Sequence, residues 1–286
     1  MKKRSIAYLI EASLAIQSVS AWDAEKVGFY SRLLADTCLP SRNPMTSEFV
    51  RRNGHVQLTI LSPSNIGLPY GTYPRLILIW VVTQATLKKS RQIFLGENLA
   101  EFIRSLGKQG SGGKTGSITA LREQTKRLFA STICVTKEGV DSWSVKNVSI
   151  TTEATILWNS NSQWSSHLLL NNDFYQELIG TAYPIDLRVV DAFSHYPFAL
   201  DIYLWLTSRY FRMYKPTLIS WLQLEDQFGN SFANSRHFHE KFKNAISKVT
   251  MLYPEARYSF KSVGLMLYPS PPHVPSSIPI PVDRYG

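Results

Sequence analysis

The hydrophobic and polar positions of the chain follow the same order in two stretches. Each stretch opens with Tyr-Pro and an apolar run, "YPRLILIWVVT" from Tyr73 and "YPFALDIYLWLT" from Tyr196. Proline suits the first turn of a helix, where the N–H group that it lacks would have no partner, so both runs predict helices. A basic linker, a short element and an amphipathic helix follow in each stretch. The amphipathic helices end at Gly107 and Gly229, because glycine is a common residue just after a helix.

A third, basic helix comes next in both stretches, followed by two alternating segments. Glycine joins these segments, Gly139 in "STICVTKEGVDSWSVKNVSI" and Gly264 in "RYSFKSVGLMLYPS", which predicts β-hairpins. A winged helix has this order of elements: a helix, a short strand, a second helix, a basic helix and a hairpin. The order occurs twice in the chain, about 120 residues apart. We therefore predict an α+β chain of two winged-helix units, over residues 55–160 and 165–270. Residues 1–54 form a helical and loop region in this prediction, with a short helix near 22–38, and residues 271–286 form a proline-rich, extended or disordered tail.

The two basic helices repeat one division into an apolar and a charged face. With 3.6 residues per turn, a helix that has Ser117 as its N-cap buries one face and exposes the other. Glu123 and Lys126 of the first helix correspond to Glu240 and Lys243 of the second. The predicted buried faces are Ile118, Leu121, Thr125, Leu128 and Phe129, and in the second helix Phe238, Phe242, Ala245, Ile246 and Val249. The predicted outer faces are Thr119, Glu123 and Lys126 flanked by Arg122 and Arg127, and Arg236, Glu240, Lys243, Asn244 and Ser247 flanked by His237, Lys241 and Lys248.

Composition indicates a partner for these charged faces. The chain has 31 Lys and Arg against 21 Asp and Glu, a net charge of +10 and a pI near 9.5. This balance favours a polyanion, nucleic acid before an anionic membrane. A basic helix fits the major groove, where Arg or Lys reads guanine, Asn adenine and Glu cytosine; a solvated charged face is the alternative. The predicted contacts to double-stranded DNA are Ser117, Thr119, Arg122, Lys126, Arg127, Arg236, Lys243, Asn244 and Lys248, with Lys137, Lys146 and Lys261 as phosphate contacts on the wings.

A glycine-rich stretch, "GKQGSGGKTGS" from Gly107, precedes the first basic helix. A Walker A loop reads G-x-x-x-x-G-K-[ST], and Gly113, Lys114 and Thr115 fill its last three positions. Its first glycine position falls on Lys108, however, and the preceding residues have a helical pattern instead of a strand pattern. We therefore interpret the stretch as a turn that lets the helix N-terminus approach a phosphate.

The sequence contains one pattern typical of a metal-dependent nickase. Residues 237–239 read His-hydrophobic-His, and Tyr210, Tyr214 and Tyr253 are candidates for the nucleophilic tyrosine. The two histidines share a face only on a strand, and the surrounding period is helical. No Cys/His zinc spacing and no G-x-S-x-G elbow is present in the sequence. We therefore expect no metal, no cofactor and no catalytic activity.

Cysteine content and the N-terminus bear on the cellular compartment. Cys38 and Cys134 form no CxxC pair and fit packing roles in a reducing cytosol. The first residues resemble a signal peptide, but Glu11 lies inside the apolar stretch, which Ser13 and Gln17 also interrupt, so we expect an amphipathic helix. The apolar run "LILIWVV" is far shorter than the roughly 18 residues of a membrane span. We therefore expect no membrane partner.

Five segments, in order along the chain, resemble plasmid-encoded RepA-type replication initiator proteins. They are "GLPYGTYPRLILIWVVTQA" from Gly67, "GSITALREQTKRLFAS" from Gly116, "ALDIYLWLT" from Ala199, "ISWLQLEDQFG" from Ile219 and "YPSPPHVP" from Tyr268. The resemblance implies a cytoplasmic protein that binds double-stranded plasmid origin DNA at short repeats and recruits host replication initiation proteins or a helicase. It also implies homodimers that repress their own gene, beside monomers that start replication. A transcriptional repressor using the same helices and an HUH-type nicking endonuclease are the alternatives.

Overall fold

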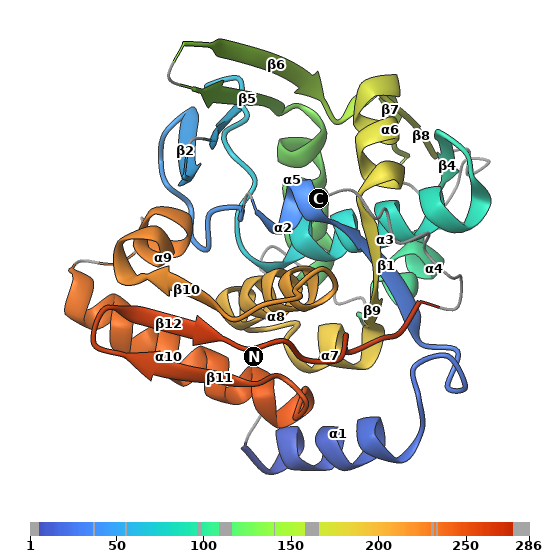
Figure 1. Ribbon diagram of the computed structural model, residues 1–286. Coiled ribbons are helices and arrows are strands. Elements are labelled where there is room, and N and C mark those ends of the chain that lie inside the picture. Colours follow the sequence, from blue (N-terminus) through green and yellow to red (C-terminus); the bar gives the residue numbers. More distant parts are fainter. Residues whose placement is uncertain are drawn as a thin grey trace.

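The fold is built around two buried helices, α3 (Thr72–Lys88) and α8 (Pro197–Tyr210) (Figure 1). A computed structural model describes residues 6–36, 38–54, 56–95, 99–108, 116–139, 141–157, 166–229, 232 and 234–276. The mixture of helices and antiparallel sheets confirms the predicted α+β class. Among the described residues, no helix combines the length and apolar character needed to cross a membrane.

The second half of the chain has the helix and hairpin order that its pattern predicts. After α8 come β10 (Thr217–Ser220), α9 (Trp221–Phe228), α10 (Ser235–Leu252), β11 (Tyr258–Lys261) and β12 (Gly264–Leu267). Ser220 and Gln223 form a reciprocal capping box that fixes the start of α9. The strands form an antiparallel sheet in the order β10-β12-β11. Gly264 is needed in this sheet because a Cβ atom there would lie 2.1 Å from the Ile219 carbonyl oxygen.

The first half contains the same helices with a different arrangement of strands. After α3 come β4 (Gln92–Phe94), α4 (Leu99–Ser105), α5 (Ser117–Phe129), β5 (Thr132–Glu138), β6 (Trp143–Ser149), β7 (Thr151–Thr155) and β8 (His167–Leu170). Pro74 lies in the first turn of α3, as predicted, and Lys89, with a φ of 49°, ends the helix. β4 pairs with β8, and β8 pairs with β7, in an antiparallel sheet.

The β5–β6 hairpin is the predicted wing of the first unit, but it does not pair with β4. It joins β2 (Glu48–Asn53) and β3 (Val56–Leu61) in an antiparallel sheet of order β2-β3-β5-β6. The alternation of apolar and polar residues predicts the hairpin but not the strand beside it. A strand has a side-chain period of two whichever strand it pairs with. Since β8 pairs with β4, the strands associated with the first unit extend past residue 160. β8 begins at His167, after residue 160, the predicted end of the first unit.

Residues 6–54 are interwoven with both halves and do not form a separate region. α1 (Ile6–Ser18) is the expected N-terminal helix, and it packs on α10 and α7 (Leu187–Ala192). The helix predicted near 22–38 is instead a strand, β1 (Val27–Ser31), followed by the short α2 (Arg32–Ala35). β1 pairs with β9 (Ala182–Asp186), which follows α6 (Asn172–Gly180). The edge-to-face contact of Tyr30 with Tyr183, at 6.4 Å between ring centroids, explains why tertiary packing favours the strand.

A buried ion pair joins α3 and α8. Arg75 Nε and Nη2 donate to the two carboxylate oxygens of Asp201 at 2.6 Å each, and the side chains are 1% and 8% exposed. The same guanidinium donates to the carbonyl oxygens of Leu39, Pro40 and Gly71. A guanidinium has five N–H donors, so each of them has a partner here, which offsets the cost of burying the charge.

The proline-rich segment packs against the molecule as far as the structure describes it, residues 271–276. Val274 is 1% exposed, and the Tyr253 hydroxyl donates to the Pro271 carbonyl oxygen at 2.5 Å. Trp22 Nε1 donates to the Pro275 carbonyl oxygen at 2.8 Å. Proline lacks an N–H group but its carbonyl oxygen accepts hydrogen bonds. These contacts show that residues 271–276 are packed and not disordered, without helix or strand, while 277–286 lie outside the described residues.

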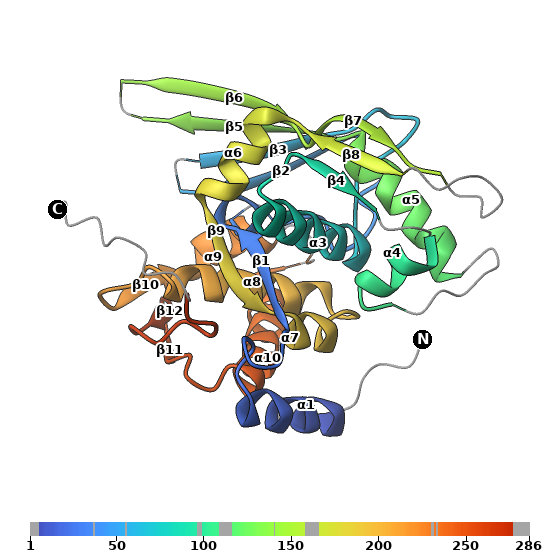
Figure 2. The same ribbon diagram turned by 90° about the vertical axis from the view of Figure 1, so that its right-hand side faces the viewer.

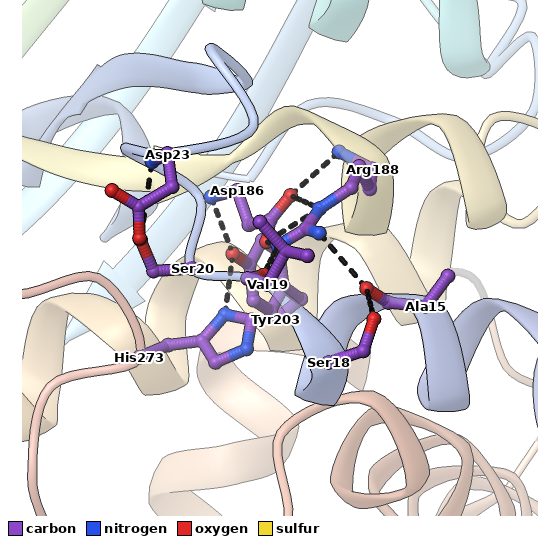
Figure 3. Close-up of polar contacts among 9 residues, drawn as sticks. All are labelled: Ala15, Ser18, Val19, Ser20, Asp23, Asp186, Arg188, Tyr203 and His273. Carbon is purple, nitrogen blue, oxygen red and sulfur yellow. Dashed lines mark hydrogen bonds and ion pairs between the residues drawn. The ribbon is translucent and has the colours of Figure 1, made fainter.

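A polar network connects this segment to α1 (Figure 3). The Asp186 N–H donates to the Tyr203 hydroxyl oxygen at 2.9 Å, and that hydroxyl lies 3.1 Å from His273 Nδ1. Arg188 donates to both carboxylate oxygens of Asp186, and to the carbonyl oxygens of Ala15 in α1 and of Val19 just after it. Burial lowers the pKa of His273. A neutral imidazole that accepts the tyrosine hydrogen therefore fits the site.

Candidate nucleic-acid interface

α10 presents a charged face to solvent and an aromatic face to the core. Phe238, Phe242, Ala245, Ile246 and Val249 are buried, which confirms the predicted division of the helix. The Asn234 side chain caps the helix by accepting from the His237 N–H at 2.9 Å. The exposed residues include Arg236, Glu240, Lys243, Asn244 and Ser247, all predicted to face outward. α10 therefore offers a continuous polar surface that the hairpin β11–β12 flanks (Figure 1).

Lys243 occupies a defined position in the middle of this surface. Its ammonium lies 5.6 Å from the ring centroid of Trp221 and 5.4 Å from that of Phe260. The two rings stack on each other at 6.0 Å with an interplanar angle of 13°. A cation over half-buried aromatic rings such as these gains about 0.5–1 kcal/mol per contact or more. α9, α10 and β11 therefore hold this lysine jointly, an arrangement that helical periodicity alone did not reveal.

Arg236 and Lys248, two other cations of α10, have different interaction partners. Arg236 Nε lies 3.6 Å from Glu240 Oε1, and both side chains are largely exposed, so the pair contributes little to stability. Asn244 is exposed one residue after Lys243. Lys248 is half-buried with its ammonium 5.2 Å from the Tyr196 ring centroid. Lys248 thus packs toward the start of α8, at the edge of the exposed face.

α5 also separates an apolar from a polar face. Leu121, Thr125 and Leu128 are buried, and Ile118 and Phe129 are half-buried. Thr119, Glu123 and Lys126 are exposed, as predicted, whereas Ser117 and Arg122 are half-buried. The N-cap is Gly116 instead of Ser117, so Ser117 is the first residue of the helix. The candidate phosphate-loop residues Gly113, Lys114 and Thr115 lie outside the described residues.

Two polar residues of α5 bind the loop that precedes α3. Gln124 is buried and accepts from the Tyr70 N–H at 2.8 Å. Arg127, predicted as a DNA contact, donates to Glu123 Oε1 at 2.8 Å and to the Leu68 carbonyl oxygen at 3.2 Å. Its guanidinium also lies 5.3 Å from the Tyr70 ring centroid. Arg127 therefore positions α5 against this loop, a role that outward periodicity did not indicate.

The three wing lysines lie in different surroundings. Lys261 is exposed at the end of β11, on the hairpin beside α10. Lys137 and Lys146 are exposed on β5 and β6, and Lys146 Nζ lies 3.7 Å from Glu177 Oε2. These two lysines belong to the β2-β3-β5-β6 sheet, so the hairpin that carries them does not pair with β4 in the way that the hairpin of the second half pairs with β10.

The His-hydrophobic-His pattern lies on α10, as its period predicted. His239 Nε2 is 2.8 Å from Glu225 Oε1, and its ring lies on Trp221 at 4.1 Å between centroids. The His237 ring instead contacts the edge of Phe232 at 5.7 Å. Within the described ranges, no group of three or more His, Cys, Asp or Glu side chains is arranged to hold a metal ion. The two imidazoles thus have separate packing partners.

Comparison with known proteins places the chain in a family. In the fold comparison, the crystal structure of domains 2 and 3 of RctB, as selenomethionine derivatives, has a TM-score of 0.51 at 9% identity, covering 83% of this chain and 96% of that one. A second RctB structure, of residues 155–483, has a TM-score of 0.49 at 9% identity and covers 82% and 93% of the two chains. No curated protein has a significant sequence match to the chain. The family described as plasmid encoded RepA protein matches residues 68–223, more than half of the 286 residues. The chain therefore belongs to the family of plasmid encoded RepA proteins.

Proposed function

We propose that the protein initiates plasmid replication by binding double-stranded origin DNA at repeated sites through the exposed faces of α5 and α10. The observation that carries this proposal is the cationic outer face of α10, with Lys243 held over Trp221 and Phe260 beside the β11–β12 hairpin. Family membership supports the role in replication. The net charge of +10 supports a polyanionic partner.

Both helices fit the recognition position of a winged helix. In the second half, α8, α9 and α10 precede a hairpin whose strand β12 pairs with β10, the strand between the first two helices. In the first half, α3, α4 and α5 have the same order, and β8 pairs with β4 in the equivalent way. We therefore assign the wing of the first unit to β7–β8 instead of β5–β6. Figures 1 and 2 place α5 in the upper part of the molecule and α10 in the lower part, so the two helices would contact separate stretches of DNA.

The exposed residues divide by what they would contact. Lys126, Lys243 and Arg236 supply charge to phosphates or guanine edges, and Asn244 has the amide that pairs with adenine. Lys261 would contact a phosphate from the wing of the second unit. Arg127 and Lys248 act by positioning α5 and α10, since their cations already have partners within the protein.

The wider role follows the family resemblance. The protein would recruit host replication initiation proteins or a helicase to the origin in the cytoplasm, and a homodimer would occupy the same sites as a repressor. No catalytic step is assigned to it, because the histidines of α10 contact Glu225 and Phe232 separately.

Fluorescence anisotropy with an origin duplex tests the DNA contacts. Lys126→Gln and Lys243→Gln should each weaken binding to all sequences and lower the salt slope by about one. Asn244→Ala should weaken only the specific duplex, by about 1–3 kcal/mol, or roughly 5- to 150-fold. Lys26→Gln, at an exposed lysine just before β1, is the matched control and should bind as the unmodified protein does. Salt slopes equal to that of the control at both positions would refute the proposal.

Two further assays separate the alternatives. Maintenance of a plasmid that carries the origin, with the protein supplied in trans, distinguishes an initiator from a repressor that uses the same helices. Incubation of supercoiled origin plasmid with Mg²⁺ distinguishes both from a nickase, which would relax the DNA and become attached through a tyrosine. We expect plasmid maintenance without relaxation.

A further inference from the structure

A large cleft lies between the β2-β3-β5-β6 sheet and the second half of the chain. It has a volume of about 1090 Å³, and α6 and the end of α8 form its other walls. Residues that alternate along adjacent strands place an aliphatic surface at one side, namely Val56, Leu58, Ile133, Val135 and Val148. This volume lies just above the usual range for small-molecule sites, about 300–1,000 Å³, which are mostly apolar with a few convergent polar groups.

The charged residues of the cleft are strongly unbalanced. Four arginines and three lysines line it against only two carboxylates among the described residues, those of Asp36 and Glu177. Two of the lysines are Lys137 and Lys146, which the β5–β6 hairpin directs here. Arg32 and Arg212 lie close enough that Arg32 adds to burial in lowering the pKa of Arg212. Like charges held near each other are stabilised when an anion binds between them.

Arg51 lies in the wall of this cleft as a buried cation with unused donors. Its side chain is packed over the Phe49 ring at 4.2 Å, and the residue is 3% exposed. Its Nε and Nη1 atoms have no hydrogen-bond partner in the described part of the chain. Asp201 cannot neutralise it fully, because both oxygens of that carboxylate bind Arg75. Burial accordingly lowers the pKa of Arg51 to about 10.

Arg209, at the end of α8, is a second arginine of the cleft that has a buried donor without a partner. Its Nε atom is buried and likewise lacks a hydrogen-bond partner among the described residues. Buried polar groups without partners are rare in native proteins, and a bound ligand is one reason for them. Arg51 and Arg209 thus both line the cleft, and each has a buried nitrogen donor without a partner in the described part of the protein.

We propose that this cleft binds a nucleoside polyphosphate, with the phosphates on the arginines and the nucleoside on the aliphatic wall. Several negative charges on a small body match the excess of cations, and arginine binds phosphate oxygens in pairs. Single-stranded DNA fits less well, because stacked bases need aromatic platforms. The aromatic residues among the described lining are Phe174, which is fully buried, and Tyr214, which is 84% exposed.

This site goes beyond the proposed DNA contacts, because it does not use the exposed face of α5. Figure 2 shows α5 near the base of the β5–β6 hairpin, away from the turn that joins the two strands. Lys126 and Lys243 are absent from the cleft lining among the described residues. Nucleotide binding and duplex binding should therefore respond to different substitutions.

Equilibrium dialysis of the full chain against radiolabelled ATP, without DNA, tests the site. Arg51→Met should weaken ATP binding about tenfold or more without lowering the Tm, because it removes an unpaired buried charge. The double variant Arg32→Gln with Arg212→Gln changes only exposed residues, so it tests the cleft even if Arg51→Met fails to fold. It should also lose about tenfold.

The matched control is Lys126→Gln with Lys243→Gln, which removes two charges from the DNA-binding face and should leave ATP binding unchanged. Absence of saturable ATP binding, or an equal loss in this control, would overturn the proposal. Tripolyphosphate binding as tightly as ATP would overturn the assignment of the aliphatic wall to the nucleoside. Displacement of ATP by oligothymidylate at equal phosphate concentration would identify a single-strand site instead.

Discussion

Replacing Asp201 by Asn tests how much the buried ion pair between α3 and α8 contributes to stability. The substitution keeps the shape of the side chain but removes its charge and turns one acceptor oxygen into an amino group. One of the two Arg75 donors, now 2.6 Å from a carboxylate oxygen, would then face another donor. Breaking a buried pair costs about 3–5 kcal/mol. Because three backbone carbonyl oxygens still accept from Arg75, we expect the lower value, about 3 kcal/mol.

Urea denaturation followed by tryptophan fluorescence measures this loss. A domain of ordinary stability has about 5–15 kcal/mol, so the midpoint should fall visibly without abolishing the fold. Arg75→Met should cost more than Asp201→Asn, because it leaves a buried carboxylate without its two arginine donors and removes the guanidinium from three carbonyl oxygens, of which that of Pro40 keeps the Gly71 N–H. The double variant should lose less than the sum, since the two residues share one interaction. A loss below about 1 kcal/mol for Asp201→Asn, or strictly additive losses, would refute the reasoning.

Three other substitutions test separate features. Gly264→Ala should lower the free energy of unfolding by more than about 2 kcal/mol in urea denaturation, because the new Cβ would collide with a carbonyl oxygen of β10. The control is Gly180→Ala, where a Cβ atom would meet open space. Equal losses for the two variants would contradict the close approach of the strands at Gly264. Arg127→Met should lower the unfolding free energy by about 1 kcal/mol, measured by thermal unfolding beside Lys126→Met, which should change it less. The pKa of His273 is lowered in the folded state, so the unfolded state binds more protons below its ordinary pKa of about 6.5, and stability should fall as pH drops from there. His273→Gln should reduce that pH dependence in urea midpoints, and an unchanged slope would show that another group causes it.

The interior face of α10 was predictable because its information is local. Five apolar residues recur with the helical period, and each of them is buried. The helical period also predicts the exposed positions of α5, but it does not predict the contacts that Gln124 and Arg127 make with the loop before α3. Their partners, Tyr70 and Leu68, lie more than 50 residues away in sequence, and no periodicity encodes such a contact.

The hydrophobic pattern also could not predict which strands pair or which buried charges meet, because these partners are far apart in sequence. The alternation of β5 and β6 is compatible with β4 or with β3, and only the assembled sheet selects β3. Arg75 stands in an otherwise apolar helix, and its partner Asp201 is 126 positions later. The order of basic helix and hairpin predicts that Lys137 and Lys146 lie on a wing, whereas their sheet turns them toward the cleft.

The pairing of β1 with β9 has a consequence for synthesis on the ribosome. Val27 pairs with Asp186, so about 160 residues separate the two strands. At 5–20 residues per second, the first strand waits roughly 8–30 s for its partner to be translated. During that interval its backbone donors and acceptors and the Tyr30 ring are exposed to water, to other nascent chains and to chaperones. β1 is therefore made early but acquires its partner strand late.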